Sequence, residues 1–128
     1  MVHITDLHFD FDYTLGAKAV CDSPLTGCCR PESGMAGEGE LGARQWGEYM
    51  CDTPRQTIEN MLNYIVDEVK PDFLIWTGDN SPHNTFELTL EQVTNYTIEV
   101  SEMIKSALEG TDITVVPIQG NHDTYPVD

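Results

Sequence analysis

The sequence predicts an α/β fold, with parallel strands, covering helices and a metal site at the carboxyl ends of the strands. Short apolar runs near residues 2–5, 73–76 and 113–118 each stop at side chains of metal-ligand types. Helical patterns at 53–70 and 89–110 separate these runs, the first after a long irregular stretch. The order β, loop, α, β, α, β is typical of a parallel sheet. Because right-handed crossovers bring such strand ends to one edge, we expect one shared site there.

The first apolar run ends on Asp6 and His8, two residues apart. If the chain stays extended beyond the strand, both side chains point to the same side and can hold one metal ion. The alternative, which the pair alone favours, is a turn with a solvated Asp and a surface His. His3 lies within the strand, where we expect a structural role.

The second and third runs end in the same way. Residues 73–76 have the composition of a buried strand, and Gly78 then lets the backbone turn sharply, which places Asp79 at a strand end. His83 follows four residues later. The third run leads into Gly-Asn-His-Asp at 120–123.

From Phe9 to Asp52 hydrophobic periodicity disappears, and the stretch is rich in Gly and Pro. Compact domains rarely keep a loop of this length unless it is functional or tied down. We expect Asp10 and Asp12 to be solvated. Trp46 and Tyr49 are expected to pack on the body of the domain, with a substrate groove as the alternative.

Four cysteines, Cys21, Cys28, Cys29 and Cys51, fall in this loop. A bond between the neighbours Cys28 and Cys29 would be strained, which leaves Cys21–Cys28 with Cys29–Cys51, or the crossed pairing. A zinc knuckle competes, although no Cys-x-x-Cys pair is present. Disulfides indicate an oxidising compartment. The glycosylation sequon at Asn95, in a predicted surface helix, agrees with secretory routing.

Both helical segments show start and stop signals. Residues 53–56 combine a Thr cap, a Pro at the first helical position and a Gln three residues after the cap, and Pro71 prevents continuation. Thr89 and Gln92 repeat the capping-box spacing, and Gly110 is placed to end the second helix. The apolar faces expected to cover the sheet are Ile58, Met61, Leu62, Ile65, Val66 and Val69 in the first helix, and Val93, Tyr96, Val100, Met103, Ile104, Ala107 and Leu108 in the second.

Composition limits the function classes. The formal charge of −16, the pI near 4.2 and only six Lys and Arg residues argue against nucleic acid as a partner. No stretch approaches the roughly 20 apolar residues of a transmembrane helix. The chain opens directly on a strand, without a signal peptide, and stops shortly after the last ligand cluster. We therefore expect residues 1–128 to be part of a longer catalytic domain.

The side chains at the strand ends suit hydrolysis of a phosphate ester. Such a reaction needs neutralised nonbridging oxygens and an ionised water, which two divalent ions bridged by a carboxylate supply. We predict that Asp79 is the bridge, that Asp6 and His8 hold one ion, and that Asn121 holds the other. Mixed nitrogen and oxygen ligands suit Zn²⁺, Mn²⁺ or Fe.

Two further histidines are candidates for work on the substrate. His83 and His122 can bind the phosphate and protonate the departing oxygen, because the pKa of imidazole lies near neutrality.

The ordered motifs carry a resemblance. Asp-x-His at 6–8, Gly-Asp at 78–79 and Gly-Asn-His-Asp at 120–123, each after a strand, resemble the calcineurin-like metallophosphoesterase superfamily. His83, four residues after Asp79, narrows it to acid sphingomyelinase and the acid-sphingomyelinase-like phosphodiesterases. Cys-Cys-Arg at 28–30, Trp-Gly-Glu-Tyr at 46–49 and Cys-Asp-Thr-Pro at 51–54 are also similar to that family.

The resemblance implies a lysosomal or secreted two-zinc phosphodiesterase that cleaves sphingomyelin, at a lipid surface, to ceramide and phosphocholine. Nucleotides or other soluble phosphodiesters are the alternative substrates, and a non-catalytic secreted fragment or binding module is the alternative of another class. The implied metal ligands are Asp6, His8, Asp79 and Asn121, the residues near the scissile phosphate are His83 and His122, and the disulfides are Cys21–Cys28 and Cys29–Cys51.

The sequence departs from the family after His122. The family completes both metal sites with histidines further along, including a Gly-His-x-His segment, and residues 123–128 contain none. We therefore expect the carboxyl-terminal half of the domain to lie beyond residue 128. Isolated residues 1–128 should bind zinc weakly and turn over little.

Overall fold

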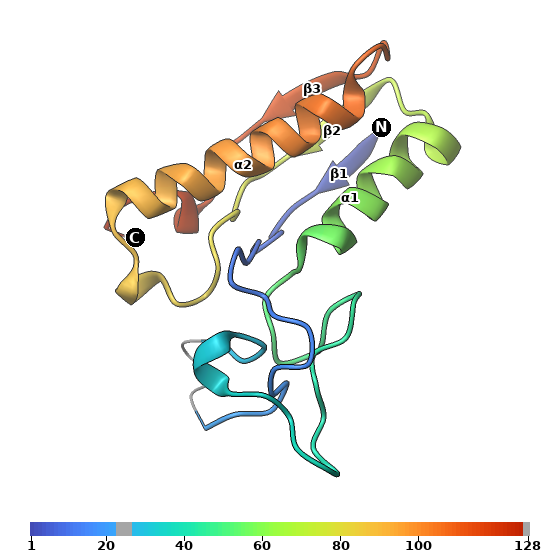
Figure 1. The fold of residues 1–128 in the computed structure, drawn as a ribbon. Helices are drawn as coiled ribbons and strands as arrows, with labels where there is room; N and C mark the ends of the chain where they lie inside the picture. The colour runs from blue at the N-terminus through green and yellow to red at the C-terminus, as the bar shows by residue number, and fades with distance from the viewer. Residues whose placement is uncertain (23–26, 127–128) are drawn as a thin grey trace.

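The structure is a computed structural model that describes residues 1–22 and 27–126. Its sheet consists of three parallel strands, β1 (Val2–Ile4), β2 (Phe73–Trp76) and β3 (Thr114–Pro117), in the order β1-β2-β3 (Figure 1). The predicted α/β fold with a parallel sheet is confirmed.

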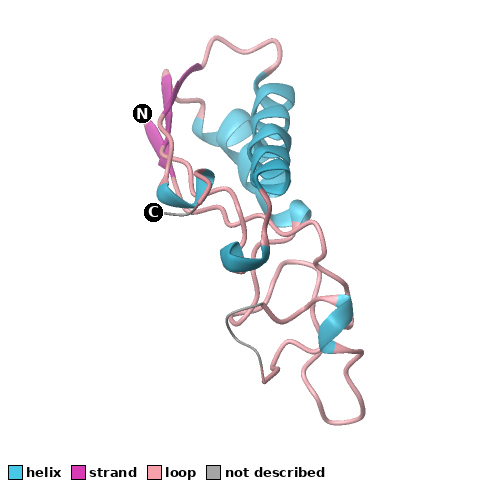
Figure 2. Ribbon diagram, turned by 90° about the vertical axis from the view of Figure 1, so that its left-hand side faces the viewer, coloured by secondary structure: helices cyan, strands magenta, loops and turns pink. Residues whose placement is uncertain are grey.

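The strand register decides where the strands end. Ile4 aligns with Trp76, and Trp76 aligns with Pro117, so the three carboxyl ends lie at one edge of the sheet. Leu74 and Trp76 are buried, whereas Phe73 is 50% exposed. The second strand is therefore buried on one face only. The reason is that both long helices cover the same face of the sheet (Figure 2).

Helix α1 (Arg55–Tyr64) and helix α2 (Leu90–Leu108) contact each other on that face. A π-helical segment, Ile65–Val69, continues α1. Apolar side chains from both helices and from the inner face of the sheet form one core. Its buried members include Ile4, Phe9, Ile58, Leu62, Ile65, Leu74, Trp76, Val93, Val100 and Ile104.

The two helices begin differently. In α2 the predicted capping box is present: the Thr89 hydroxyl accepts the Gln92 N–H at 3.3 Å, and the Gln92 carbonyl oxygen accepts the Thr89 N–H at 2.8 Å. The predicted Thr cap of α1 is wrong, because the cap residue is Pro54 and makes no side-chain cap bond. Thr53 instead pairs through its backbone with the segment that follows β1.

The carboxyl end of the first helical stretch also differs from the prediction. Val69, expected on the apolar face, is 44% exposed. The wider π-helical winding of Ile65–Val69 explains this, since it rotates the last residues away from the face set by α1. Lys70 then adopts a left-handed conformation, and the helix ends before Pro71 as predicted.

Residues 10–22 and 27–52, called the disulfide-tied lobe below, project from the body of the molecule (Figure 1). Disulfides join Cys21 to Cys28 and Cys29 to Cys51. The crossed pairing and the zinc knuckle are therefore excluded. The described residues of the lobe contain only a single helical turn, Pro31–Ser33, and isolated bridges. The prediction of a long loop tied by cysteines is confirmed.

Two predictions within the lobe are wrong. Asp10 is buried rather than solvated, because its Oδ2 accepts a hydrogen bond from the buried Arg30 Nε at 2.6 Å. Asp12 is exposed as expected. Trp46 and Tyr49 do not pack on the body of the domain: they are 58% and 99% exposed. Trp46 and Tyr49 line a surface groove of about 420 Å³.

Among the described residues, no helix has the length and apolar character needed to cross a membrane. Asn95 is exposed on α2, and its glycosylation stays a prediction.

Candidate metal centre

The segments after β1 and β2 run side by side at the edge where the strands end. The Asp6 N–H donates to the Gly78 carbonyl oxygen at 3.1 Å, and the His8 N–H donates to the Asp79 carbonyl oxygen at 2.9 Å. Asp6 and His8 therefore lie next to Asp79, as predicted from the parallel topology.

The backbone reaches this arrangement in an unexpected way. Asp6, His8 and Asp79 have φ values of 54°, 39° and 57°, in the left-handed region that non-glycine residues rarely adopt. The extended continuation assumed for Asp6 and His8 is therefore wrong, although the two side chains still converge. Strained backbone of this kind clusters at functional sites, where the surrounding structure holds it in place.

Ligand atoms of Asp6, His8 and Asp79 all lie within 4.8 Å of one another. The Nδ1 atom of His8 is 2.8 Å from the carbonyl oxygen of Ser81. Because a carbonyl only accepts, Nδ1 must carry the proton, and Nε2 keeps its lone pair. This nitrogen lies 3.9 Å from Asp6 Oδ1. A backbone carbonyl that orients the ring of a metal-binding histidine is the usual supporting contact.

The environment of His8 favours its neutral form. Burial lowers the pKa of His8 below its usual value of 6.5, and it outweighs the hydrogen bond to Ser81, which acts in the opposite direction. The nearby His83 and His122 lower the pKa of His8 further. Since only the neutral imidazole binds a metal ion, these effects extend metal binding toward lower pH.

The turn after β3 is bound to the turn after β2. Asp79 Oδ1 accepts the N–H of His122 at 2.9 Å, while Asp123 Oδ2 accepts the N–H groups of Asp79 and Gly120, each at 2.9 Å. Asn121 opens this turn, between Gly120 and His122. The third predicted strand end is thus brought to Asp79.

Two glycines allow the turns to come this close. A Cβ atom on Gly78 would lie 2.2 Å from Asp123 Oδ2, and one on Gly120 would lie 2.2 Å from Asp79 Oδ1. Gly78 also has a φ of 77°. Any side chain at either position would separate the two turns.

Three imidazole rings gather beside the carboxylates. The rings of His8 and His83 stack with centroids 3.9 Å apart, and His122 lies 4.9 Å from His8 and 5.7 Å from His83. The buried Nδ1 of His122 has no hydrogen-bond partner among the described residues. His3, by contrast, bonds to Thr77 through Nε2 at 2.9 Å and belongs to the sheet, as predicted.

The residues present fit a metal centre. Carboxylates and a neutral imidazole nitrogen converge, and a buried imidazole nitrogen without a partner is what a site for a bound ligand would leave. Mixed nitrogen and oxygen donors match Zn²⁺, Mn²⁺ or Fe.

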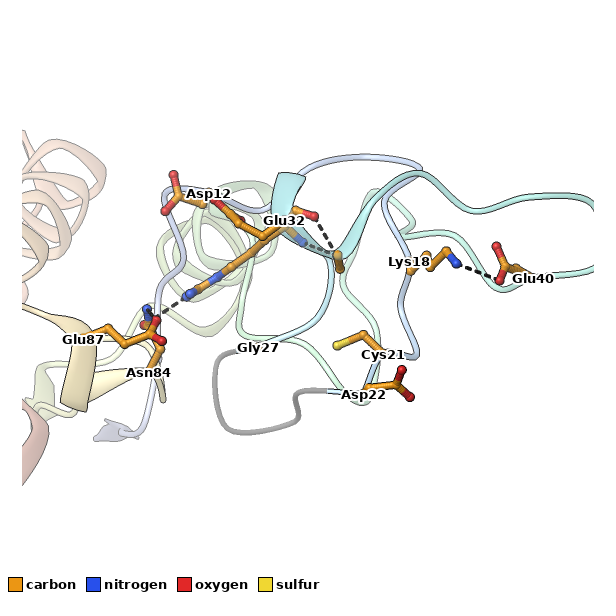
Figure 3. Close-up of a pocket in the computed structure, with 11 residues that line it drawn as sticks. Asp12, Lys18, Cys21, Asp22, Gly27, Glu32, Glu40, Asn84 and Glu87 are labelled. Carbon is orange, nitrogen blue, oxygen red and sulfur yellow. Dashed lines mark hydrogen bonds and ion pairs between the residues drawn. The ribbon is translucent and has the colours of Figure 1, made fainter.

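A cavity of about 690 Å³ lies elsewhere, between the disulfide-tied lobe and the loop at 84–87 (Figure 3). None of the four predicted metal ligands lines it, and neither do His83 and His122. Its rim is crowded with acidic side chains, including Glu32, Glu40 and Glu87. The cavity is therefore separate from the converging strand ends.

The sequence profile of the calcineurin-like phosphoesterases matches residues 1–128. The chain belongs to the calcineurin-like phosphoesterase family. Sphingomyelin phosphodiesterase B of Dictyostelium discoideum is 38% identical over 129 residues, 99% of this chain and 20% of that protein. Sphingomyelin phosphodiesterase of Homo sapiens is 34% identical over 128 residues, again 99% of this chain and 20% of the relative. Acid sphingomyelinase-like phosphodiesterase 3b of Mus musculus is 38% identical over 127 residues, 97% and 25% respectively.

This calcineurin-like phosphoesterase chain therefore spans about a fifth to a quarter of the length of these relatives. Family membership implies metal ions, and the cluster of Asp6, His8 and Asp79 is the place in the described residues where ligand atoms of the predicted set meet.

Two further functional candidates in this phosphoesterase chain were missed by sequence reasoning. Asp123 was seen only as part of a motif, yet it accepts four N–H hydrogen bonds that connect the turns. Asp52 contacts His83 from the disulfide-tied lobe, with Oδ1 2.5 Å from Nδ1. The sequence signal for Asp52 is its place in the Cys-Asp-Thr-Pro segment at 51–54, which carries part of the family resemblance but assigns Asp52 no role.

Proposed function

We propose that this chain is the amino-terminal part of the catalytic domain of a zinc phosphodiesterase that hydrolyses sphingomyelin to ceramide and phosphocholine. The observation that carries the proposal is the convergence of Asp6, His8 and Asp79, whose ligand atoms lie within 4.8 Å of one another. The kinship with sphingomyelin phosphodiesterases supports the choice of substrate.

The proposed roles follow from the chemistry of each side chain. Two bound divalent ions supply neutralisation of the nonbridging phosphate oxygens and an ionised water molecule. Asp79 would be the shared ligand, Asp6 and His8 would hold one ion, and Asn121 would hold the other. Elements beyond residue 128 complete both ligand sets.

His83 and His122 act on the substrate. Their ring centroids lie 3.9 Å and 4.9 Å from that of His8, which places both imidazoles next to the proposed metal ligands. One of them donates a proton to the departing ester oxygen, a contribution of about 10²- to 10⁴-fold for a positioned general acid.

The proposed location is lysosomal or secreted. Two disulfides within the described residues are typical of an oxidising compartment. The exposed aromatic rings of Trp46 and Tyr49 suit a protein that meets its substrate at a lipid surface, since such rings combine an apolar body with a polar tip.

The complete encoded protein, loaded with zinc, should release phosphocholine from sphingomyelin in mixed micelles. Asp79→Asn should abolish this release, whereas Asp67→Asn, an exposed carboxylate outside the site, should not. If the protein hydrolyses nucleotide diesters but not sphingomyelin, its substrate is a soluble phosphodiester and the proposed substrate is wrong. No hydrolysis of any phosphodiester would favour a non-catalytic binding module and overturn the proposal.

A further inference from the structure

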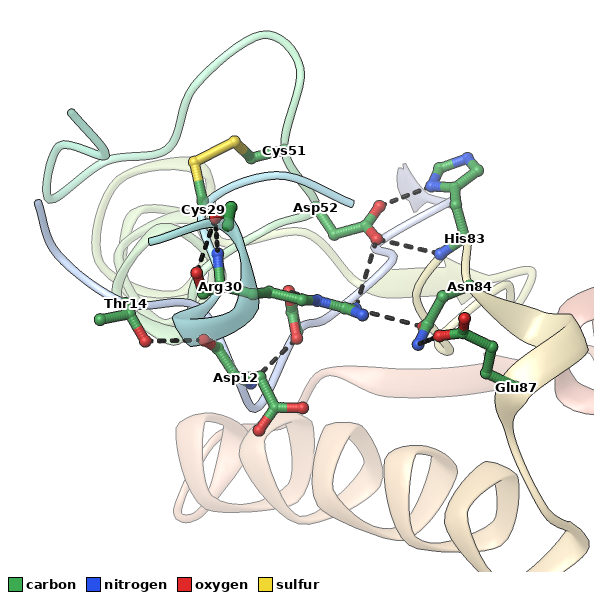
Figure 4. Close-up of polar contacts among 11 residues, drawn as sticks. Asp12, Thr14, Cys29, Arg30, Cys51, Asp52, His83, Asn84 and Glu87 are labelled. Atoms are coloured by element: carbon green, nitrogen blue, oxygen red, sulfur yellow. Dashed lines mark hydrogen bonds and ion pairs between the residues drawn. A yellow bond between two sulfur atoms is a disulfide. The ribbon is translucent and has the colours of Figure 1, made fainter. Parts of the chain in front are cut away.

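Asp52 holds His83 by two contacts at once. Its Oδ1 lies 2.5 Å from the Nδ1 of His83, and its Oδ2 accepts the backbone N–H of His83 at 3.0 Å (Figure 4). The Asp52 side chain is only 5% exposed, whereas that of His83 is 57% exposed. The His83 ring is therefore held mainly by Asp52 and by the neighbouring rings of His8 and His122.

The disulfide-tied lobe is what brings Asp52 to this place. Asp52 comes directly after Cys51, which is bonded to Cys29, and Arg30 comes directly after Cys29. The Arg30 guanidinium is buried and lies 3.9 Å from Asp52 Oδ2. Its Nε donates to Asp10, another buried carboxylate of the lobe. The Cys29–Cys51 disulfide fixes the backbone next to Asp52, and the Arg30 guanidinium contacts the Asp52 carboxylate through Oδ2.

The contact selects one form of the His83 ring. A carboxylate accepts hydrogen bonds, so Nδ1 of His83 carries the proton that faces Asp52. The Nε2 atom then lies on the far side of the ring, away from the carboxylate (Figure 4). A carboxylate behind an imidazole fixes both its tautomer and its orientation in this way.

We propose that Asp52 is a positioning residue that orients the His83 imidazole toward the scissile phosphodiester, and that the disulfide-tied lobe serves as its support. This inference rests on the proposed function. In the step concerned, His83 is the imidazolium, with its Nδ1 proton facing Asp52 and a second proton on Nε2. The hydroxide formed from an ionised water bonds to phosphorus, the ester P–O bond breaks, and the Nε2 proton passes to the departing alkoxide, which leaves His83 neutral with its proton on Nδ1.

A direct metal-ligand role is the competing explanation for Asp52. Ligand atoms of His8, Asp52 and His83 also lie within 4.8 Å of one another. Both Asp52 oxygens, however, are already engaged by His83, and Oδ2 faces the guanidinium of Arg30. A neighbouring cation disfavours a bound metal ion at that carboxylate, so positioning is the better explanation.

The test is a double-mutant cycle on the complete, zinc-loaded protein, with two substrates. The leaving group of sphingomyelin is an alkoxide, which needs a proton as it departs. The leaving group of nitrophenyl phosphocholine is a nitrophenolate, which is stable as an anion and departs without a proton. Asp52→Asn should lower kcat on sphingomyelin by about 10²-fold with little change in KM, and should hardly affect the nitrophenyl ester. His83→Gln should show the same pattern, and adding Asp52→Asn to it should have no further effect.

Effects that multiply in the double variant, or that are equal on both substrates, would overturn the proposal. Loss of one zinc per molecule in Asp52→Asn would also overturn it, because Asp52 would then be a ligand. Glu40→Gln breaks an exposed ion pair with Lys18 in the same lobe and should change none of these readouts. If the Asp52→Asn variant does not fold, the Asp52→Glu variant, which keeps the negative charge, takes its place in the double-mutant cycle.

A spectroscopic readout separates this inference from the proposed function. The Nδ1 proton of His83 should give a downfield proton resonance that Asp52→Asn removes and Glu40→Gln retains. A wild-type protein that shows the resonance but hydrolyses no phosphodiester would overturn the proposed function while the orientation by Asp52 stands. An active wild type without the resonance would overturn the positioning role alone.

Discussion

Asp123 and Asp79 are bound to each other's turns. Asp123 Oδ2 accepts the backbone N–H of Asp79 at 2.9 Å, and Asp79 Oδ1 accepts the backbone N–H of His122, the neighbour of Asp123, at 2.9 Å. The proposed bridging carboxylate is thus fixed in place by the strand end that carries Asn121. Substitutions that break the hydrogen bonds between these two turns should lower both the free energy of unfolding and the affinity for metal.

Asp123→Asn should weaken both properties. Asp123 accepts four N–H hydrogen bonds, from Asp79, Gly120 and twice from Asn80. An amide keeps one acceptor oxygen and turns an NH₂ group toward the remaining donors, at a cost on the order of 2–4 kcal/mol. Zinc affinity should fall about 10- to 100-fold, as for other residues that support ligands. Denaturant unfolding and chelator competition measure the two effects.

The control for that variant is Asp112→Asn, an exposed carboxylate in the loop before β3. It should leave the free energy of unfolding and the zinc affinity unchanged. Equal effects of the two substitutions would show that Asp123 does not hold the turns together.

Gly78→Ala and Gly110→Ala should separate backbone strain from close approach. Both glycines have a φ of 77°, so both alanines incur the left-handed penalty of about 1–2 kcal/mol. A Cβ on Gly110 would meet nothing within 4 Å, whereas one on Gly78 would lie 2.3 Å from the backbone nitrogen of Gly120. Gly78→Ala should therefore cost roughly 1–3 kcal/mol more in the free energy of unfolding. Equal losses would mean that the turns do not meet as described.

Removal of the two disulfides should affect activity differently. Cys21–Cys28 spans 7 residues and Cys29–Cys51 spans 22. On the loop-entropy account, their removal as paired Cys→Ser changes costs ~2 and ~3 kcal/mol respectively. Only the second loss should also reduce activity on sphingomyelin per folded molecule, because Cys51 precedes Asp52. Equal activity losses in the two paired variants would contradict the supporting role of the lobe.

His8 should titrate below 6.5 in the metal-free protein. Burial lowers its pKa in the folded state, so the unfolded chain binds a proton first as the pH falls. Stability of the metal-free form should therefore decrease as the pH falls from 6.5 through the lowered pKa of His8, and should not depend on this group above 6.5. Proton NMR of the His8 ring measures the midpoint, and a midpoint at or above 6.5 would be contrary to the burial described.

The sequence was informative where local rules decide the structure. Alternating apolar runs, the capping box at Thr89 and the glycine at position 78 predicted the strands, the α2 start and the sharp turn before Asp79, and all three are present. The parallel order of the strands then sufficed to bring the predicted ligands to one edge.

Local rules failed where a distant partner decides. Asp10 reads as a solvated loop residue, but Arg30, 20 residues away, buries it in an ion pair. Asp52 and His83 are 31 residues apart, and no spacing pattern links them. The left-handed conformations of Asp6 and His8 arise from backbone pairing with the turn after β2, which no feature of their own segment indicates.

Diffraction from crystals of the complete, zinc-loaded protein, collected at the zinc absorption edge, tests the central claim most directly. The account predicts two anomalous peaks roughly 3.5 to 4 Å apart, with the carboxylate of Asp79 between them. Asp6 and His8 should contact one peak and Asn121 the other. A single peak, or two peaks that Asp79 does not touch, would contradict it.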